Sequence, residues 1–401
     1  MTLQEKILNL EPVNILDYKN DFPDFLLLEA TPQSKKWHQE GNVLIHTNMV
    51  MEKALEISVK ETNKELGINL YLGALLHDFG KIETSEVRDD GRVNAYGHEG
   101  VGVSRARAFL KKYFPQYGYA RQAYILSLVE FHGHPKRLIT DGSKDSKFLQ
   151  LSLDVNTRQV HDLEVADFTG RIGDHPDKEL KCLADFKKKC EELGVWDKYY
   201  EIPDSQDLKQ NCYNIIRWNV LFHNMDDKDK LKRLRIDALS NKEPRAGLLI
   251  PIGAPGSGKS TYIESMYPHL KNVSMDDERK RLCGDTSDMS RNQEAFENCF
   301  RELRDLMRKR ESAIWDATNT TRKIRRQLID LARQNGVEVV MIYFDMPLDL
   351  VLERNRTRDR VVPEDVVLKY YNQIQIPKPY EYDHLLVIDE TYKYETTKSI
   401  R

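Results

Sequence analysis

Residues 248–261 read LLIPIGAPGSGKST, and this stretch decides the fold of the C-terminal part of the chain. The glycines, Lys259 and Ser260 complete the pattern G-x-x-x-x-G-K-S, which forms a loop between a strand and a helix. The apolar run 248–252 fits the strand. Glycines let backbone N–H groups point at phosphate oxygens, and the start of the following helix adds favourable partial charge. The sequence therefore predicts a nucleoside triphosphate site, without showing what accepts the phosphate.

The expected contacts of this loop follow from its chemistry. Lys259 should reach the β- and γ-phosphates and take part in catalysis, and the hydroxyl of Ser260 should help to hold Mg²⁺. ATP or another nucleoside triphosphate, with Mg²⁺, is the expected cofactor. The predicted nucleotide-binding residues are Gly253, Ala254, Pro255, Gly256, Ser257, Gly258, Lys259, Ser260 and Thr261.

Two kinds of hydrophobic pattern divide the chain. From residue 247 onwards, short β-rich runs alternate with amphipathic helices, which predicts a parallel sheet covered on both faces. Before it, helical spacing predicts an all-helical domain of about 170 residues. The predicted strands are LLIPIG, KNVSM, AIWDAT, VEVVMIYFD and HLLVID, and the predicted helices are 43–58, 66–79, 98–113, 120–132 and 159–171.

The expected fold is therefore multidomain, an all-α helical bundle followed by an α/β domain with a parallel sheet. We place an N-terminal extension at 1–35, the helical domain at 36–195, a helical connecting subdomain at 196–245 and the α/β domain at 246–401. The connecting segment includes the basic stretch KDKLKRLR. No internal repeat is visible.

Composition bounds the class of protein. The 401 residues include 61 basic and 64 acidic side chains, a formal net charge of −3, so nucleic-acid binding would need local basic patches such as KDKLKRLR and TRKIRRQ. The five cysteines show no C-x-x-C spacing, which is typical of a reduced compartment. No apolar run approaches the roughly 20 residues of a membrane span. These features predict a cytoplasmic protein that does not enter membranes.

Histidine and aspartate residues on five predicted helices fall at positions that could converge. Such a mixed set suits transition metals such as Mn, Fe, Co, Ni or Zn, and helical bundles build metal sites in this way. Lys81, three residues after Asp78, could neutralise phosphate or the charge that develops on a leaving oxygen. The predicted ligands are His46, His77, Asp78, His98, His132 and Asp167.

Each of these residues also has an ordinary interpretation. His98 could simply begin a helix, His132 and His134 could be loop histidines, and Asp167 could be a solvated helix residue. The apolar stretch LYLGAL directly ahead of His77 and Asp78 favours the metal site, because burying two polar residues behind it is costly without partners.

The motifs HQEGNVLIHT, ALLHDFGK, YGHEG, VEFHGH and EVADFTGR, in this order, resemble the HD-domain superfamily of metal phosphohydrolases. The resemblance covers about residues 36–172 and is closest to HD modules attached to tRNA nucleotidyltransferases. It implies one metal held by His46, His77, Asp78 and Asp167. It also implies a second metal held by His98 and His132, with Asp78 bridging the two. His134 competes with His132 for this role, and members with one metal exist.

The phosphate acceptor must be inferred from other residues. Asp276 and Asp277 follow the predicted strand KNVSM, where a carboxylate could take the proton from an attacking hydroxyl. Alternatively, these aspartates only cap the next helix. In LERNRTRDRVVP the arginines alternate, so on a helix Arg354 and Arg358 would share one face while Arg356 and Arg360 share nearly the opposite one. One pair could then cover ATP phosphates while the other faces solvent, or the whole helix is merely solvated.

The motifs GAPGSGKST, SMDDERKRL, DATNTTRKIRRQ and RNRTRDRVVPEDVV resemble the bacteriophage-type polynucleotide 5′-kinase family over about residues 247–375. The resemblance implies Asp276 as general base on a 5′-hydroxyl and Arg279 as ligand of the acceptor's neighbouring phosphate. Arg354 and Arg358 would be lid arginines on ATP. Thr318 and Asn319 match the acceptor side and are predicted to bind substrate, whereas Asp316 departs from the metal-binding aspartate expected after an apolar strand.

As a whole, the chain resembles proteins that fuse an HD phosphoesterase to a polynucleotide kinase, which heal broken nucleic-acid ends. This implies phosphorylation of 5′-hydroxyl ends and metal-dependent removal of 2′,3′-cyclic phosphate and 2′-phosphate. RNA or DNA ends are the implied partners, with a separate ligase as a further candidate; the oligomeric state stays open. The alternatives are a nucleotide hydrolase fused to a small-molecule kinase, or a chain in which one half is catalytically silent.

Overall fold

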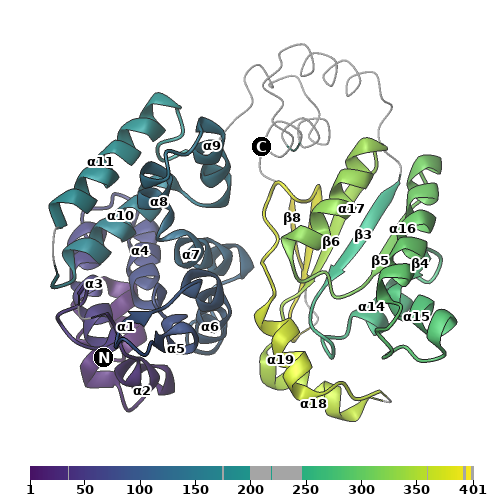
Figure 1. Ribbon diagram of the computed structural model, residues 1–401, viewed down its shortest axis with the longest axis horizontal. Coiled ribbons are helices and arrows are strands. Elements are labelled where there is room, and N and C mark those ends of the chain that lie inside the picture. The colour runs from purple at the N-terminus through teal and green to yellow at the C-terminus, as the bar shows by residue number, and fades with distance from the viewer. Residues whose placement is uncertain are drawn as a thin grey trace. The chain divides into compact units, whose positions relative to one another are not determined.

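The computed structural model describes residues 1–198 apart from 35, 174 and 175, then Trp218, 246–391 apart from 359, and 394–398. The chain divides into two compact units, residues 1–200 and 201–401 (Figure 1). The predicted connecting subdomain at 196–245, including KDKLKRLR, lies outside the described residues except for its first three positions and Trp218.

The first unit is a helical bundle, as predicted. The helices α3 (Val43–Ser58) and α6 (His98–Tyr113) begin and end where the apolar spacing places them. Helices α4 (Lys64–Leu76), α7 (Tyr119–Phe131) and α10 (Thr157–Thr169) lie within three residues of their predicted bounds. The further elements are α1 (Leu3–Asn9), η1 (Ile15–Tyr18), α2 (Pro23–Ala30), α5 (Lys81–Thr84), α8 (His134–Thr140), α9 (Asp145–Asp154) and α11 (Pro176–Glu192).

Helix α4 is the centre of this bundle. Every residue of it from Gly67 to Leu76 is buried, which is the pattern of a helix covered on all sides. It packs against α3, α7 and α10. Gly73 permits the approach of α7, because a Cβ there would lie 3.2 Å from Leu128 Cδ1. The helix ends at Leu76, so it delivers His77 and Asp78 from the middle of the bundle.

The first 35 residues, expected as an extension, pack onto the bundle. Leu3 and Ile7 of α1 and Phe25 and Leu28 of α2 are buried. Phe25 lies against Phe109 of α6, with ring centroids 6.1 Å apart. This segment therefore belongs to the first compact unit.

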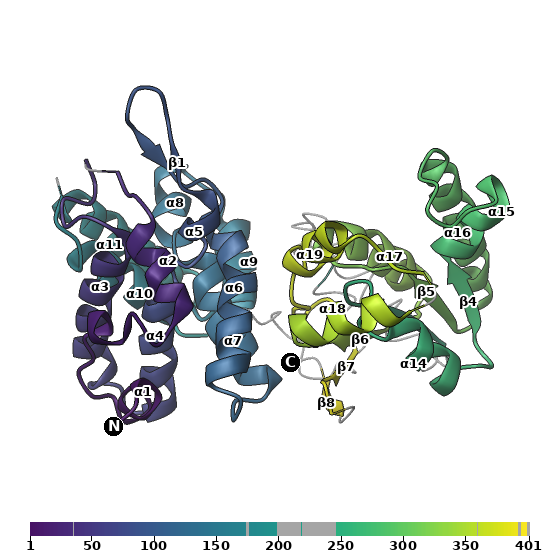
Figure 2. The ribbon, with the colours of Figure 1, turned by 90° about the horizontal axis from the view of Figure 1, so that it is seen from below.

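A short hairpin interrupts the helices between α5 and α6. Its strands β1 (Glu86–Val87) and β2 (Val93–Asn94) are antiparallel, and the turn contains Gly91 at a φ of +75°. The sequence indicated only a polar separating stretch here. Figure 2 shows the hairpin extending beyond the ends of the neighbouring helices.

The second unit is built on one sheet with the strand order β4-β5-β3-β6-β7-β8. The five predicted strands are confirmed and run parallel, and β8 adds an antiparallel edge that the sequence did not indicate. The bounds are β3 (Gly247–Ile252), β4 (Lys271–Ser274), β5 (Ala313–Asp316), β6 (Glu338–Phe344), β7 (His384–Ile388) and β8 (Tyr394–Lys398).

Helices cover both faces of the sheet (Figure 1). Helix α17 (Arg322–Gln334) packs against β6, and α16 (Asn292–Lys309) packs against β4 and β5. Helices α14 (Lys259–Met266), α15 (Met275–Cys283), α18 (Leu348–Thr357) and α19 (Glu364–Asn372) complete the unit. All five parallel strands carry their carboxyl ends to one edge, where α14 and α15 begin.

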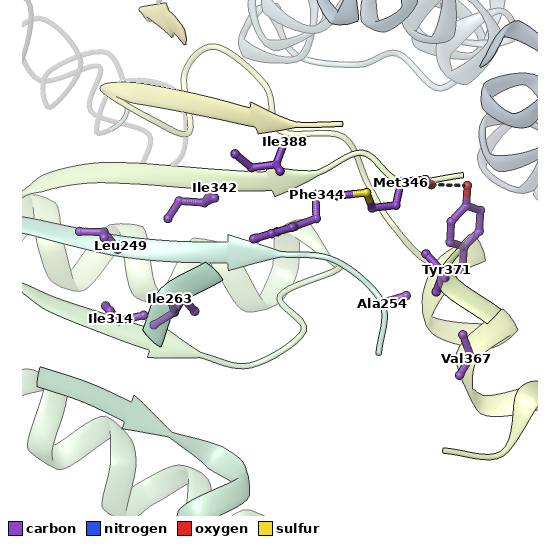
Figure 3. Packing of buried hydrophobic residues seen from close by; sticks show 11 residues of the cluster. Leu249, Ala254, Ile263, Ile314, Ile342, Phe344, Met346, Val367, Tyr371 and Ile388 are labelled. Carbon is purple, nitrogen blue, oxygen red and sulfur yellow. Dashed lines mark hydrogen bonds between the residues drawn. The ribbon is translucent and has the colours of Figure 1, made fainter. Parts of the chain in front are cut away.

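An apolar cluster joins this edge to α19 (Figure 3). Leu249, Ile342 and Ile388 contribute side chains from neighbouring strands. At the far end of the cluster, the hydroxyl of Tyr371 donates a hydrogen bond of 3.0 Å to the carbonyl of Met346. This packing fixes α19 near the loop that follows β3.

Candidate active sites

Three histidines of the first unit are held in the same way. The Nδ1 atoms of His77, His98 and His132 each lie 2.7–2.8 Å from the backbone carbonyl oxygen three residues earlier in the chain. A carbonyl can only accept a hydrogen bond, so Nδ1 must carry the proton. Each Nε2 then presents a lone pair, which is the tautomer that a metal ligand needs.

Asp78 lies between two sets of these nitrogens. Its Oδ2 is 3.3 Å from His77 Nε2 and 3.6 Å from His46 Nε2, whereas its Oδ1 is 3.4 Å from His98 Nε2. Lys81 Nζ lies 2.6 Å from Oδ2. Burial raises the pKa of Asp78, but its neighbours His77 and Lys81 outweigh burial and hold that pKa well below its usual range.

The predicted ligands converge into two groups that could each hold a cation. One group is His46, His77 and Asp167, and the donor atoms within it all lie within 4.8 Å of one another. Asp78, His98 and His132 form the other on the same criterion. In addition, His77 Nε2 is buried and makes no hydrogen bond to the described residues. Buried nitrogens without partners are costly, so this donor set fits divalent metal ions.

The structure favours His132 over His134 as a member of the second group. His132 Nε2 lies 3.1 Å from His98 Nε2, and burial, followed by the charge of His98, lowers the pKa of His132 to about 3. His134 instead packs edge-on against Phe131, with ring centroids 4.9 Å apart. Among the described residues, no group of metal-ligating atoms includes His134.

Sequence reasoning missed Glu40, which orients His46. One carboxylate oxygen, Oε1, lies 2.9 Å from His38 Nδ1 and 3.0 Å from His46 Nδ1, and Oε2 accepts a 2.9 Å hydrogen bond from the Ile172 amide. Hydrogen bonding to the two imidazoles outweighs burial and lowers the pKa of Glu40. Glu40 lies in an irregular loop before α3, where no periodicity marks it, and its spacing from His46 in HQEGNVLIHT was the only signal.

A pocket of about 360 Å³ opens onto the two groups, and both carboxylates and cationic side chains line it. Lys81, which was predicted, lines it together with Lys136, Arg137 and Arg171, which were not. Cationic side chains beside a group of candidate metal ligands can contact an anionic substrate such as a phosphate ester.

The phosphate loop of the second unit has the predicted strand–loop–helix form. Gly256 and Gly258 adopt φ of +85° and +92°, which favour glycine. A Cβ on Gly256 would lie 2.6 Å from the carbonyl oxygen of Val351, so a larger residue would push the loop away from α18. Lys259 Nζ donates to the carbonyls of Gly253 and Ala254 at 2.8 and 2.9 Å. The ammonium group is thus held inside the loop, where phosphates would lie.

Asp276 stands at the start of α15 and is not its cap. The cap is Ser274, whose hydroxyl accepts a 3.2 Å hydrogen bond from the amide of Asp277. Asp276 is therefore available for other contacts, and its carboxylate binds Arg279 and lies 3.1 Å from Arg360 Nη1. The side chain of Asp276 is half-exposed, so an acceptor hydroxyl can reach it.

Arg279 is held in place by several contacts. Besides Asp276, it donates to the carbonyl of Thr286 at 2.9 Å and to Asn292 Oδ1 at 3.0 Å. Its side chain is largely buried, so little of the guanidinium is open to a substrate.

The expectation that Arg354 and Arg358 share a helix face is wrong. Helix α18 ends at Thr357, and Arg358 is extended with φ of −84° and ψ of 155°, so the four-residue spacing of a helix does not apply to it. Arg358 nevertheless interacts electrostatically with the phosphate loop: after burial, its charge contributes to lowering the pKa of Lys259. Arg354 Nη1 lies 3.8 Å from Met346 Sδ.

Of the other two arginines, Arg356 faces solvent as expected, with 61% of its side chain exposed, whereas Arg360 contacts Asp276. Arg356 forms an ion pair of 2.7 Å with Glu364, which joins α18 to α19. Arg360 reaches Asp276, far from it in sequence. Because the chain leaves the helix before Arg360, this side chain turns towards Asp276 instead.

Thr318 and Asn319 connect the ends of β3 and β5. The carbonyl of Thr318 accepts a 3.1 Å hydrogen bond from the amide of Gly253. Asn319 is buried, has a φ of +50°, and its amide nitrogen donates to the carbonyl of Pro251 at 2.8 Å. These residues therefore fix the position of the phosphate loop relative to the neighbouring strand.

Asp316 lies where a metal-binding carboxylate would be useful, although its sequence match was poor. It ends β5 directly beside Ser274 of β4, after three buried residues. Its Oδ2 accepts a 3.3 Å hydrogen bond from Asn272, and burial raises its pKa. The carboxylate also interacts electrostatically with Lys259.

The basic segment 321–327 is only partly available for nucleic acid. Arg325 lies on the buried face of α17 and is fully buried. Its Nε and Nη2 donate to Glu381 at 2.9 and 3.0 Å. Arg325 therefore adds nothing to the basic patch predicted at TRKIRRQ, because amphipathic spacing turns its side chain inwards.

Comparison with known proteins agrees with this geometry. Residues 43–167 match the model of the HD domain, and residues 248–376 match that of an AAA domain. The chain thus joins an HD domain to an AAA domain that carries the phosphate loop. No helix among the described residues has the length and apolar character needed to cross a membrane.

Individual relatives each share part of the chain. A multifunctional CCA protein of Pasteurella multocida is 24% identical over 237 residues, which are 57% of this chain and 49% of that protein. An L-seryl-tRNA(Sec) kinase of Methanococcus maripaludis is 27% identical over 140 residues, 32% of this chain and 53% of that protein. The chain thus spans about half the length of these curated relatives.

Among solved structures, a chain from the structure of the Pnkp1/Rnl/Hen1 RNA repair complex matches at 22% identity with a TM-score of 0.32. The match covers 41% of this chain and 51% of that one.

Proposed function

We propose that this protein heals nucleic-acid ends. Its kinase domain would phosphorylate the 5′-hydroxyl of RNA or DNA from ATP or another nucleoside triphosphate. The HD domain would remove 2′,3′-cyclic phosphate and 2′-phosphate. The observation that carries the proposal is the presence, in one chain, of a complete phosphate loop and of a histidine cluster divided by Asp78. A substrate that gains phosphate at one end and loses it at the other explains both.

The residues of the HD domain fit a divalent metal centre. His46, His77, Asp78 and Asp167 would hold one ion, and Asp78, His98 and His132 the other. When bound, such ions supply Lewis acidity and lower the pKa of a bound water. Lys81, 2.6 Å from Asp78, would compensate the negative charge of the phosphate and of the oxygen that leaves.

In the kinase domain, Asp276 would act as the general base. The 5′-oxygen would attack the γ-phosphorus, the bond from that phosphorus to the β–γ bridging oxygen would break, and the hydroxyl proton would pass to Asp276. Arg279 and Arg360 hold the carboxylate in place. Lys259 and Arg358, which interact electrostatically, would stabilise charge on the transferring phosphoryl group.

A polynucleotide acceptor is supported by two further observations. Asp276 is half-exposed at the edge of the sheet, where a large acceptor has access. The name of the relative L-seryl-tRNA(Sec) kinase describes a kinase that acts on a group carried by tRNA. RNA or DNA ends are therefore the proposed partners, and a separate ligase would join the healed ends.

One incubation tests the proposal. An oligoribonucleotide with 5′-hydroxyl and 2′,3′-cyclic phosphate ends is supplied with ATP, Mg²⁺ and, in turn, Mn²⁺, Co²⁺, Ni²⁺, Fe²⁺ or Zn²⁺, and both ends are analysed. We expect a 5′-phosphate and a 3′ end free of phosphate. Asp78→Asn should abolish only the second change. Phosphorylation of free nucleosides in preference to the oligonucleotide would instead support a small-molecule kinase.

A further inference from the structure

A second pocket adjoins the metal-ligating cluster of the HD domain. Its volume is about 580 Å³, and His38, Lys81 and His98 line both it and the smaller pocket described above. Pockets of about 300–1,000 Å³ hold ligands much larger than a phosphate group. The space therefore accommodates a part of the substrate that does not react.

Two aromatic side chains line this pocket and remain exposed. The relative exposure of Trp37 is 39% and that of Tyr96 is 79%, high values for rings of this size. Exposed aromatic rings beside a reactive centre are typical of surfaces that bind flat ligands. Nothing in the chemistry of the metal cluster requires them.

The backbones that carry these rings are held in place. The amide of Trp37 donates a 3.0 Å hydrogen bond to the carbonyl of Ser34, and a Cβ on Gly173 would lie 2.7 Å from the carbonyl oxygen of Trp37. Tyr96 lies between Ala95, whose carbonyl accepts from His98 Nδ1, and the residues that begin α6. The hairpin β1–β2 ends shortly before it in the chain. Tyr96 therefore directly follows a residue whose backbone is hydrogen-bonded to His98, a candidate metal ligand.

The walls of the pocket are positively charged. The single acidic residue among the residues that line it, Glu179, lies 3.2 Å from Lys136 and 3.4 Å from Arg171. Five cations line the pocket, although the whole chain has a formal net charge of −3. They are Lys36, Lys81, Arg92, Lys136 and Arg171. A ligand that is both anionic and aromatic fits these walls, and single-stranded nucleic acid has both properties.

We propose that Trp37 and Tyr96 stack the last bases of a single-stranded 3′ end and thereby bring its terminal phosphate to the metal cluster. This inference rests on the proposed function of the HD domain and adds the residues that would hold a single-stranded end. Stacking is tolerant of sequence because every base has a π-face, so the site prefers oligonucleotides to mononucleotides without preferring a sequence.

The test compares two substrates of the full-length protein. The first is a single-stranded oligoribonucleotide with a 2′,3′-cyclic phosphate, and the second is glycerol 1,2-cyclic phosphate, which has the same cyclic diester and no base. Trp37→Ala and Tyr96→Ala should each lower the ratio of kcat/KM for the first to kcat/KM for the second by about 5- to 150-fold. This is the factor that one lost base–aromatic stack is worth. The loss should lie in KM for the oligonucleotide.

Two kinds of control accompany these variants. Trp37→Phe and Tyr96→Phe keep a ring and should restore most of the ratio. Val87→Ala removes an exposed apolar side chain of the hairpin that precedes Tyr96, outside the pocket, and should leave both activities unchanged.

The outcomes separate this inference from the proposed function. If the wild-type protein hydrolyses neither substrate, the function proposed for the HD domain is wrong. If it hydrolyses both but the ratio does not change in either alanine variant, only the stacking site is wrong. Equal kcat/KM for a 2′,3′-cyclic mononucleotide and the oligonucleotide would also overturn it, because the pocket would then bind free nucleotides.

Discussion

The imidazole rings of His98 and His132 meet at their Nε2 atoms, which lie 3.1 Å apart. Each ring uses its Nδ1–H on a backbone carbonyl, so in the neutral rings two lone pairs face each other across this gap. Such an arrangement is unfavourable in a buried site unless a cation lies nearby to accept both. The geometry thus favours a second metal, which Asp78 would share with the first.

His132→Ala should remove this second metal. We expect titration of the metal-free protein with Mn²⁺ to show two classes of site in the wild type and one in the variant. His134→Ala is the matched control, two residues away and outside the cluster, and should keep both classes. Two classes of site in His132→Ala and one in His134→Ala would instead make His134 the ligand of the second metal.

Glu40→Gln should weaken binding of the first metal ion without removing one of its ligands. The carboxylate fixes the ring of His46 through Nδ1, and loss of such a partner typically lowers metal affinity by about 10- to 100-fold. The measurement is the Kd for Mn²⁺ together with phosphoesterase activity across metal concentrations. Excess metal should restore activity if Glu40 only positions His46. Gln39→Ala, an exposed neighbour, is the control.

Asp276→Ala should lower kinase activity by about 10²- to 10⁴-fold, the usual contribution of a general base. Phosphate removal by the HD domain should be unaffected. Asp277→Ala is the control for an effect on the start of the helix. Ser274, rather than either aspartate, is the cap, so this variant should retain kinase activity. Equal losses in the two variants would contradict a specific role for Asp276.

The sequence predicted best what local interactions determine. The bounds of α3 were predicted because apolar periodicity coincides with a cap, where the Asn42 side chain accepts from the amide of Ile45. The phosphate loop was predicted because its glycines are needed for backbone geometry at Gly256 and Gly258. The metal ligands were predicted as a set because several polar residues follow or interrupt apolar helices.

The sequence did not predict side-chain positions that depend on tertiary contacts. Glu40 acts through His46 from an irregular loop, and nothing in the residues around it indicates burial. Arg360 contacts Asp276 only because α18 ends at Thr357, and the arginine-rich sequence itself would allow the helix to continue. Arg325 looks like its basic neighbours, yet the buried Glu381 that pairs with it lies 56 residues away.

Nucleotide affinity should depend on pH through Lys259. Burial, followed by the charge of Arg358, lowers the pKa of Lys259 from 10.5 to about 8 in the nucleotide-free protein. Phosphates favour the charged form and raise that pKa again, so binding takes up a proton above pH 8. Affinity for ATP should therefore fall as the pH rises beyond about 8, approaching tenfold per pH unit.

The same pKa shift makes the free energy of unfolding depend on pH, and a single substitution tests both effects. Between pH 8 and 10.5 the unfolded chain binds more protons at Lys259 than the folded protein does, so this residue's contribution to the free energy of unfolding increases with pH. Lys259→Arg keeps its charge throughout this range and should flatten both dependences, even though its affinity is lower. The measurements are the Kd for ATP by calorimetry and urea unfolding at several pH values. The same slopes in wild type and variant would show that another group titrates.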